Sequence, residues 1–377
     1  MLFSQIAGMV ETKERLINAV KNNHVAHAQL FAGSDGGPNL ALALAFATYI
    51  NCEDKKESDS CGLCYSCIKY NKLIHPDLHF IFPVSTTKSV TKDPLSINFL
   101  KDWRNFVIAH PYADVNTWGS FIGAENKQLS ISVEEARNII KTISLKSFEA
   151  EYKVLILWLP EMMNPSGSNA ILKILEEPPV KTIFLLVTNH SEKIITTIIS
   201  RTQRVSIRAF RDQEIMNELI TNFKVEEKKA FRLAYLANGN MMEGLRILEE
   251  AEDNSHELFR NWMRSCYKKN NLPDLISFLD DIQKLGREGQ KSLLLYGLNI
   301  MRECLVFKYS RELSRTEKEE YAFVEKFSQA ITENKASEIS KNLNDSYYHI
   351  ERNGSAKIIF LDTSLKISKI LKSQDGL

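Results

Sequence analysis

The sequence lacks an excess of charge of either sign. Its 48 Lys and Arg residues balance 47 Asp and Glu residues, for a formal net charge of +1 at pH 7. No global field therefore draws the protein to nucleic acid or to a membrane surface, and any DNA contact must come from a local patch or from partner chains. A long apolar run is also missing, because the longest one, 40–50, falls well short of the roughly 20 residues that a membrane helix needs. The first residues do not form a signal peptide either, so we expect a cytoplasmic protein with no membrane partner.

Glycine, proline and cysteine are also sparse, with 15, 10 and 6 residues in a chain of 377. This composition, with no internal repeat, excludes fibrous and low-complexity classes and is typical of globular domains. The length exceeds the roughly 250–300 residues that one core can serve, so two or three domains are expected. In a cytoplasmic protein the few cysteines are more typical of metal ligands or buried thiols than of disulfides.

Short apolar runs alternate with helical patterns over roughly the first 205 residues. This alternation predicts an α/β domain with a parallel, doubly wound sheet. A capping box, Ser132 with Glu135, predicts the start of one helix. From Phe210 onward the periodicity is helical and predicts an all-α region. The strands are expected at 29–32, 78–82, 154–159 and 182–188.

A glycine-rich loop follows the first expected strand and precedes a helix, which is the setting of the phosphate-binding motif G-x-x-x-x-G-K-[ST]. Pro38 stands where the motif has its last glycine, Asn39 where it has lysine, and Leu40 where it has the hydroxyl residue. Asn39 carries no positive charge for the phosphates, and Leu40 cannot bind Mg²⁺. The loop therefore retains the backbone of a phosphate site without its chemistry. The glycines that remain are Gly33, Gly36 and Gly37.

Four cysteines follow that helix with the spacing C-x8-C-x2-C-x2-C. Four thiolates form a closed tetrahedral shell around Zn²⁺, which is typical of a structural site. Two alternatives remain open: four buried reduced thiols, which the polar spacer disfavours, and an iron–sulfur cluster, whose usual spacings differ. The two other cysteines, Cys266 and Cys304, lie on apolar helical stripes and are expected to be packing residues. The predicted zinc ligands are Cys52, Cys61, Cys64 and Cys67.

The order of these features resembles the AAA+ subunits of bacterial DNA polymerase III clamp loaders, and most closely the ATPase-inactive delta-prime type. The resemblance spans most of the chain and is weakest at 84–127, which we interpret as an insertion with partial helix. The segments that carry it, besides the four cysteines, are 27–33, His75-Pro76-Asp77, 169–179 (Asn-Ala-Ile-Leu-Lys-Ile-Leu-Glu-Glu-Pro-Pro), Ser200-Arg201-Thr202 and 350–357.

The resemblance implies three domains. An AAA+ P-loop-type sheet domain would occupy 1–207 and include the zinc module at 52–67. A small helical lid would occupy 208–254, and a C-terminal helical collar at 255–377 would assemble with other subunits into a pentamer. The implied partners are the ATPase subunits and the delta subunit, with the sliding clamp and primed DNA reached through the complex.

The same resemblance implies which positions bind and hydrolyse ATP in active relatives, and other residue types stand at most of these positions here. Active relatives end the strand at 154–159 with two acidic residues, where this chain has Trp158 and Leu159. Met242 stands where an active lid would place a phosphate-sensing arginine, although Asn189 keeps a polar sensor position. With the altered loop, these changes imply no ATP cofactor and no intrinsic enzyme activity.

Arg201, by contrast, is retained. In active and inactive relatives alike, the arginine of a Ser-Arg-Cys motif reaches the ATP of a neighbouring subunit. Here the motif reads Ser200-Arg201-Thr202, which keeps the cation. The resemblance thus implies an arginine finger in trans; the alternative for a lone arginine in a turn is an ordinary surface residue.

Three classes of function follow. The first is a non-catalytic assembly subunit that supplies Arg201 to an adjacent ATPase. The second is an AAA+ ATPase subunit with an atypical nucleotide site, which needs substitutes for the missing cation and carboxylate. The third, a zinc-dependent DNA-binding module acting alone, is disfavoured by the near-neutral charge.

Overall fold

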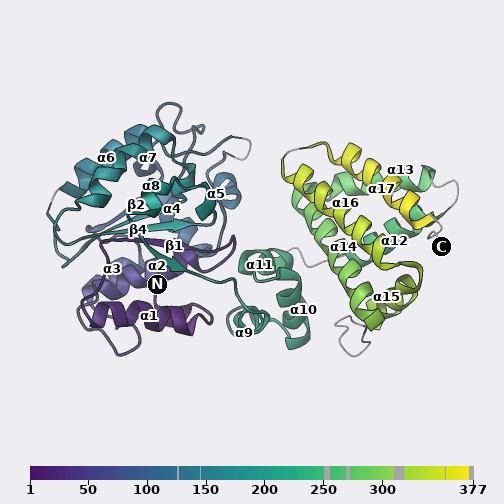
Figure 1. Cartoon of the computed structure of the whole chain (residues 1–377), viewed down its shortest axis with the longest axis horizontal. Coiled ribbons are helices and arrows are strands. Elements are labelled where there is room, and N and C mark those ends of the chain that lie inside the picture. Colours follow the sequence, from purple (N-terminus) through teal and green to yellow (C-terminus); the bar gives the residue numbers. More distant parts are fainter. Residues whose placement is uncertain are drawn as a thin grey trace. The chain divides into compact units, whose positions relative to one another are not determined.

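The computed structural model describes residues 1–124, 127–144, 146–249, 255–268, 272–309, 318–352 and 354–372. The chain divides into two units, Met1–Leu245 and Arg246–Leu377. Figure 1 draws the first from purple to green and the second from green to yellow.

A five-stranded sheet, parallel throughout, organises the first unit, with the strand order β2-β3-β4-β1-β5. The predicted parallel sheet is therefore confirmed. Leu159, which was expected to end the strand at 154–159, instead lies just after that strand and has a left-handed backbone conformation, with φ of 57°. One edge strand, β5, was not predicted. The strands are β1 (Ala28–Ala32), β2 (Leu78–Ile81), β3 (Lys153–Trp158), β4 (Thr182–Thr188) and β5 (Gln203–Ser206).

Helices cover both faces of this sheet (Figure 1). Alternate strand residues point to opposite faces, so Leu30 joins the core beneath α6–α8 while Phe31 contacts Phe46 of α2 with ring centroids 6.0 Å apart. Every residue of α2 is buried, as expected of a helix that is apolar all round. The covering helices are α1 (Val10–Lys21), α2 (Asn39–Ile50), α3 (Tyr65–Asn71), α6 (Val133–Ser144), α7 (Pro165–Glu176) and α8 (Thr196–Ile199).

The predicted capping box at α6 forms only by half. The backbone N–H of Glu135 donates to Oγ of Ser132 at 3.1 Å, but the Glu135 carboxylate accepts the backbone N–H of Ser96 at 2.8 Å. Glu135 therefore ties the insertion to the sheet domain. The remaining α-helices of this unit are α4 (Leu100–Ala109) and α5 (Val115–Phe121) in the insertion, then α9 (Asp212–Phe223), α10 (Glu227–Ala237) and α11 (Met241–Glu249). Of these, α11 extends past Leu245, the last residue of the first unit.

In the described residues of the second unit all regular secondary structure is helical, as predicted. Trp262 lies at its centre, stacked on Phe278 with centroids 5.2 Å apart, and its indole N–H donates to Oγ of Ser364 at 2.8 Å. No helix in the described part of the chain is long and apolar enough to cross a membrane. The helices are α12 (Ser255–Tyr267), α13 (Leu272–Lys284), α14 (Gly286–Tyr309), α15 (Lys318–Ala330), α16 (Glu333–Glu351) and α17 (Ala356–Lys372).

Candidate functional sites

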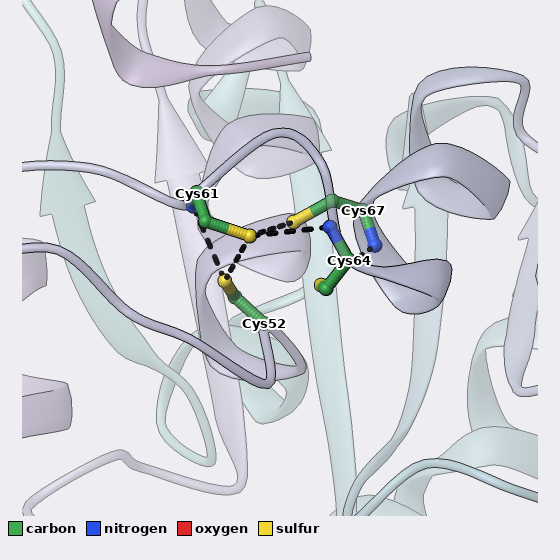
Figure 2. Close-up of side chains that lie close together, drawn as sticks. All are labelled: Cys52, Cys61, Cys64 and Cys67. Carbon is green, nitrogen blue, oxygen red and sulfur yellow. Dashed lines mark hydrogen bonds between the residues drawn. The ribbon is translucent and has the colours of Figure 1, made fainter.

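Four cysteine sulfurs gather between the end of α2 and the start of α3 (Figure 2). The Sγ of Cys61 lies 3.6 Å from that of Cys52 and 3.9 Å from that of Cys67, and all four sulfurs lie within 4.8 Å of one another. A tetrahedral ion with metal–sulfur bonds of about 2.3 Å sets neighbouring sulfurs roughly 3.8 Å apart. The predicted set, completed by Cys64, is thus brought together at a spacing that suits one tetrahedral ion.

Backbone amides point at these sulfurs. Cys61 N–H donates to Sγ of Cys52 at 3.3 Å, Cys64 N–H to Sγ of Cys61 at 3.3 Å, and Cys67 N–H to Sγ of Cys64 at 3.4 Å. Burial raises the pKa of Cys61, but hydrogen bonds from the backbone of Leu63 and Cys64 outweigh it and lower the pKa to about 6. Burial raises the pKa of Cys67, so binding of a metal there must release a proton.

Cys266 and Cys304 take no part in this cluster. Both are buried in the core of the second unit, and burial raises the pKa of each thiol to about 12. The structure therefore places them as packing residues, as predicted.

The His75-Pro76-Asp77 segment binds the loop at 148–150, which is distant in the sequence. The Asp77 carboxylate, 1% exposed, accepts the backbone N–H groups of Phe148, Glu149 and Ala150 at 2.5–2.8 Å. His75 accepts the backbone N–H of Asp77 through Nδ1 at 3.1 Å, and its Nε2 lies 3.4 Å from the Glu149 carboxylate. This motif is therefore structural in the first unit.

The glycine-rich loop is closed by a network centred on Asn39, the first residue of α2. This side chain is buried, and its Nδ2 donates to the carbonyl of Ser34 at 3.0 Å and to Oδ1 of Asn189 at 2.9 Å. Asn189 donates in turn to Oδ1 of Asp35 at 2.6 Å. A Cβ added at Gly33 would lie 2.0 Å from Oδ1 of Asn39. Asn39 thus spans the loop from Ser34 and bonds to Asn189 after β4.

Residues that begin α11 lie directly on this loop. The backbone N–H of Met241 donates to the carbonyl of Gly36 at 3.1 Å. Gly36 has φ of +64°, and a Cβ there would lie 1.7 Å from Oδ1 of Asn240. The space next to the glycines is therefore occupied by the chain's own residues.

The insertion contacts the same helical segment. The sulfur of Met242 lies 3.3 Å from the backbone nitrogen of Asp114 and 3.5 Å from Oγ1 of Thr117, both of which can donate to it. Tyr112 packs edge-on against Phe210, with centroids 5.4 Å apart. Met242, which the resemblance would set at the position of a phosphate-sensing arginine, therefore contacts Asp114 and Thr117 of the insertion.

Trp158 ends β3 inside an aromatic cluster supplied by the insertion. Its ring lies 5.0 Å from that of Trp103, which stacks on Phe82 at 4.1 Å and meets Trp118 edge-on at 5.2 Å. Trp103 and Trp118 are fully buried, and Trp103 packs on Phe80 of β2 and Trp158 of β3 as well as on Trp118. Trp158 and Leu159 together fill the end of β3 with apolar groups.

One carboxylate near this strand end was missed at the level of sequence. Glu161 accepts a hydrogen bond from Oγ1 of Thr188 at 2.9 Å and from the backbone N–H of Asn189 at 3.3 Å. Burial raises the pKa of Glu161, and these hydrogen bonds only partly offset the rise. Its signal was a glutamate that follows a buried strand by three residues.

Arg201 follows β4 in the sequence and lies in the short segment between α8 and β5. Its Nε donates to Oε1 of Glu176 at 2.6 Å, and its Nη2 contacts the same oxygen. Its Nη1 donates to the carbonyl of Thr197 at 2.9 Å and to Oγ of Ser200 at 3.3 Å. Among the residues described, these partners belong to α7, α8 and its C-cap, so Arg201 bonds to no residue of its own glycine-rich loop.

Comparison with known proteins gives a consistent assignment. A family model described as "DNA polymerase III, delta subunit" matches residues 8–211, more than half of the 377 residues. The DNA polymerase III subunit tau of Bacillus subtilis (strain 168) is 26% identical over 328 residues, which are 81% of this chain and 50% of that protein. The subunit delta' of the same organism is 26% identical over 237 residues, or 63% of this chain and 58% of that protein.

Among solved structures, a gamma subunit-related protein from Thermotoga maritima aligns over 96% of this chain and 100% of its own, with 14% identity and a TM-score of 0.42. The chain spans about half the length of the curated relatives it matches, with 50% of tau and 58% of delta' covered.

Proposed function

Because the chain belongs to the DNA polymerase III delta subunit family, we propose that it is a non-catalytic clamp-loader subunit of the delta-prime type. In this role it is a structural partner in the complex that loads the sliding clamp onto primed DNA, and it supplies Arg201 to the ATP site of a neighbouring subunit. The single observation that carries this proposal is the contrast between a closed glycine-rich loop and a partly exposed arginine elsewhere on the same domain.

The closed loop supports the absence of ATP chemistry. ATP hydrolysis of the P-loop type needs a lysine at the β/γ-phosphates, a hydroxyl on Mg²⁺ and an acidic residue after the neighbouring strand. Asn39 is instead hydrogen-bonded to Asn189, Leu40 is buried, and Trp158 packs against Trp103. None of these three side chains offers a charge to a nucleotide.

Arg201 supports a role in trans. A guanidinium that reaches the transferring phosphoryl group stabilises its negative charge and is worth on the order of 10³–10⁵ in rate. Arg201 is held on a short segment between α8 and β5, and its side chain is 30% exposed. It is therefore available to an adjoining subunit, with Ser200 beside it.

The four cysteines support one structural Zn²⁺. The sulfur spacing suits a tetrahedral ion, and four protein ligands leave no open position for chemistry. When bound, zinc would join the end of α2 to the start of α3 through Cys52, Cys61, Cys64 and Cys67. We assign it to stability of the sheet domain.

The chain would then consist of a sheet domain at 1–207, a lid at 208–254 and a collar at 255–377. Its partners would be the ATPase subunits and the delta subunit, and it would meet the sliding clamp and primed DNA through them, in the cytoplasm. Residues 250–254, at the end of the proposed lid, lie outside the described residues.

A second candidate, an ATPase with an atypical site, is favoured by one observation. Glu161 places a carboxylate beside Asn189, near the loop. Its two oxygens already accept hydrogen bonds from Thr188 and Asn189, which leaves less of it for a metal ion or for water.

Reconstitution tests the proposal. The chain is mixed with the clamp-loader ATPase subunits and the delta subunit of its own organism, and complex formation, DNA-stimulated ATP turnover and clamp loading are measured together. We expect a stable complex whose turnover depends on this chain, although the chain alone turns over no ATP. Turnover by the isolated chain would favour the second candidate, and failure to assemble would contradict both.

A further inference from the structure

Two sequence motifs that lie 25 residues apart meet in the structure. Glu176 belongs to the Leu-Glu-Glu-Pro-Pro segment, which the proposed function leaves without a role, and Arg201 belongs to Ser-Arg-Thr. The Nε and Nη2 atoms of Arg201 both bond to Oε1 of Glu176, the former at 2.6 Å. Glu176 of the first motif therefore holds the side chain of Arg201 in the second.

The backbone fixes both partners. Glu176 is the last residue of α7, which the side chain of Asn164 caps at its start and which ends before Pro178 and Pro179. Ser200 caps the C-terminus of α8 and β5 begins at Gln203 beside β1, so only three residues separate the helix from the strand. Neither Glu176 nor Arg201 lies on a long loop, so their separation is set by packed elements.

The hydrogen bonds of the Arg201 guanidinium fix its orientation and still leave one N–H group free to donate. Arginine has five N–H donors. Glu176 takes the edge formed by Nε and Nη2, and Nη1 donates to the carbonyl of Thr197 at 2.9 Å and to Ser200 at 3.3 Å. One Nη2 hydrogen has no partner in the described part of the chain. The group can thus meet an incoming anionic oxygen without releasing Glu176.

We infer that Glu176 is a positioning residue for Arg201. It would hold the guanidinium in the orientation that a neighbouring subunit's phosphate requires, so that this long side chain is ordered before the transition state forms. This inference rests on the proposed function. Because the side chains of Arg201 and Glu176 are both partly exposed to solvent, the pair contributes little to the stability of the fold, and its loss should affect turnover rather than folding.

The test is a double-mutant cycle in the reconstituted complex with Glu176→Gln, Arg201→Ala and both together. The matched control is Glu177→Gln, because no hydrogen bond within the described residues joins Glu177 to Arg201. We expect Glu176→Gln to lower kcat about tenfold with little change in the KM for ATP, and Glu177→Gln to change neither. The double variant should match Arg201→Ala, since Glu176 then has nothing to position.

A second readout uses the isolated chain. In ¹⁵N spectra of the arginine side chains, the Nε–H of Arg201 should exchange slowly with water in the wild type and rapidly in Glu176→Ala. If Arg201→Ala leaves turnover unchanged, the proposed function fails and this inference with it. If Arg201→Ala lowers turnover while Glu176→Gln leaves it unchanged or raises it, the positioning role alone is overturned.

Discussion

The side-chain amide of Asn39 donates a 2.9 Å hydrogen bond to Oδ1 of Asn189, across the glycine-rich loop. This bond joins the start of α2 to the end of β4, and Asp35 extends it along the loop. With Met241 bonded to Gly36, the site is filled by its own chain. This arrangement supports the proposal that the loop keeps its structural role without binding a phosphate.

The first prediction concerns nucleotide binding. The isolated chain should show no saturable binding of Mg-ATP at concentrations up to about 1 mM, because the loop offers neither a cation nor a free cradle. Equilibrium titration with a fluorescent ATP analogue measures this, with an ATPase subunit as the positive control. Restoring the motif with Asn39→Lys and Leu40→Ser should not restore hydrolysis, because Trp158 still provides no carboxylate. Micromolar, Mg²⁺-dependent binding by the wild type would contradict this.

The second prediction concerns the aromatic cluster. Trp158→Ala should lower the free energy of unfolding by about 3–5 kcal/mol, because it leaves a cavity beside Trp103. Phe148→Ala is the control, since that side chain is 81% exposed and its loss should cost at most about 0.5 kcal/mol. Urea unfolding at pH 7 gives both values. Equal effects of the two substitutions would show that Trp158 is not a core residue.

The third prediction concerns the metal. The purified chain should contain about one zinc per molecule, and Cys64→Ser should reduce this content to near zero and lower the melting temperature. Cys304→Ser should leave the zinc content unchanged, because Cys304 lies in the core of the second unit. Metal analysis by mass spectrometry decides the question. A wild-type chain without zinc would remove the assignment.

The fourth prediction concerns pH. Burial alone would raise the pKa of Asp77, but hydrogen bonds from the backbone of Ala150, Glu149 and Phe148 outweigh it and hold the pKa below its usual value. A lowered pKa in the fold stabilises the protein above the unfolded-state value of about 3.9, and this stabilisation is lost as the pH falls through the folded-state value.

Asp77→Asn should therefore cost about 1–3 kcal/mol at pH 7 and progressively less below about pH 4. Asp54→Asn is the control, because the Asp54 side chain is 67% exposed. Urea unfolding across this pH range measures the difference. A cost of Asp77→Asn that stays constant from neutral to acid pH would contradict the role of its charge.

Much of the sheet domain could be predicted because its strands are strongly patterned. β3 and β4 are buried on both faces and read as continuous apolar runs. β5 was missed because it is an edge strand in which only Val205 is buried, so its sequence shows no apolar run. The lesson is that burial produces the pattern, and an exposed edge strand carries almost none.

The candidate sites also include features that the sequence predicts and features that it does not. The cysteines could be predicted as a cluster because ligand spacing is local in sequence. The contact of Asn240 with Gly36, the carboxylate of Glu161 beside Asn189, and the pairing of Glu176 with Arg201 all depend on packing between distant segments. No local pattern encodes such contacts, and they became visible only in the folded chain.

The measurement that tests the central claim most directly is ATP turnover by the reconstituted complex containing Arg201→Ala. Arg204→Ala, a nearby exposed arginine, is the matched control. We predict that both variants assemble normally, that Arg204→Ala is unaffected, and that Arg201→Ala lowers DNA-stimulated turnover at least about tenfold, since an arginine finger is worth on the order of 10³–10⁵ in rate. Full turnover by an assembled Arg201→Ala complex would contradict the claim.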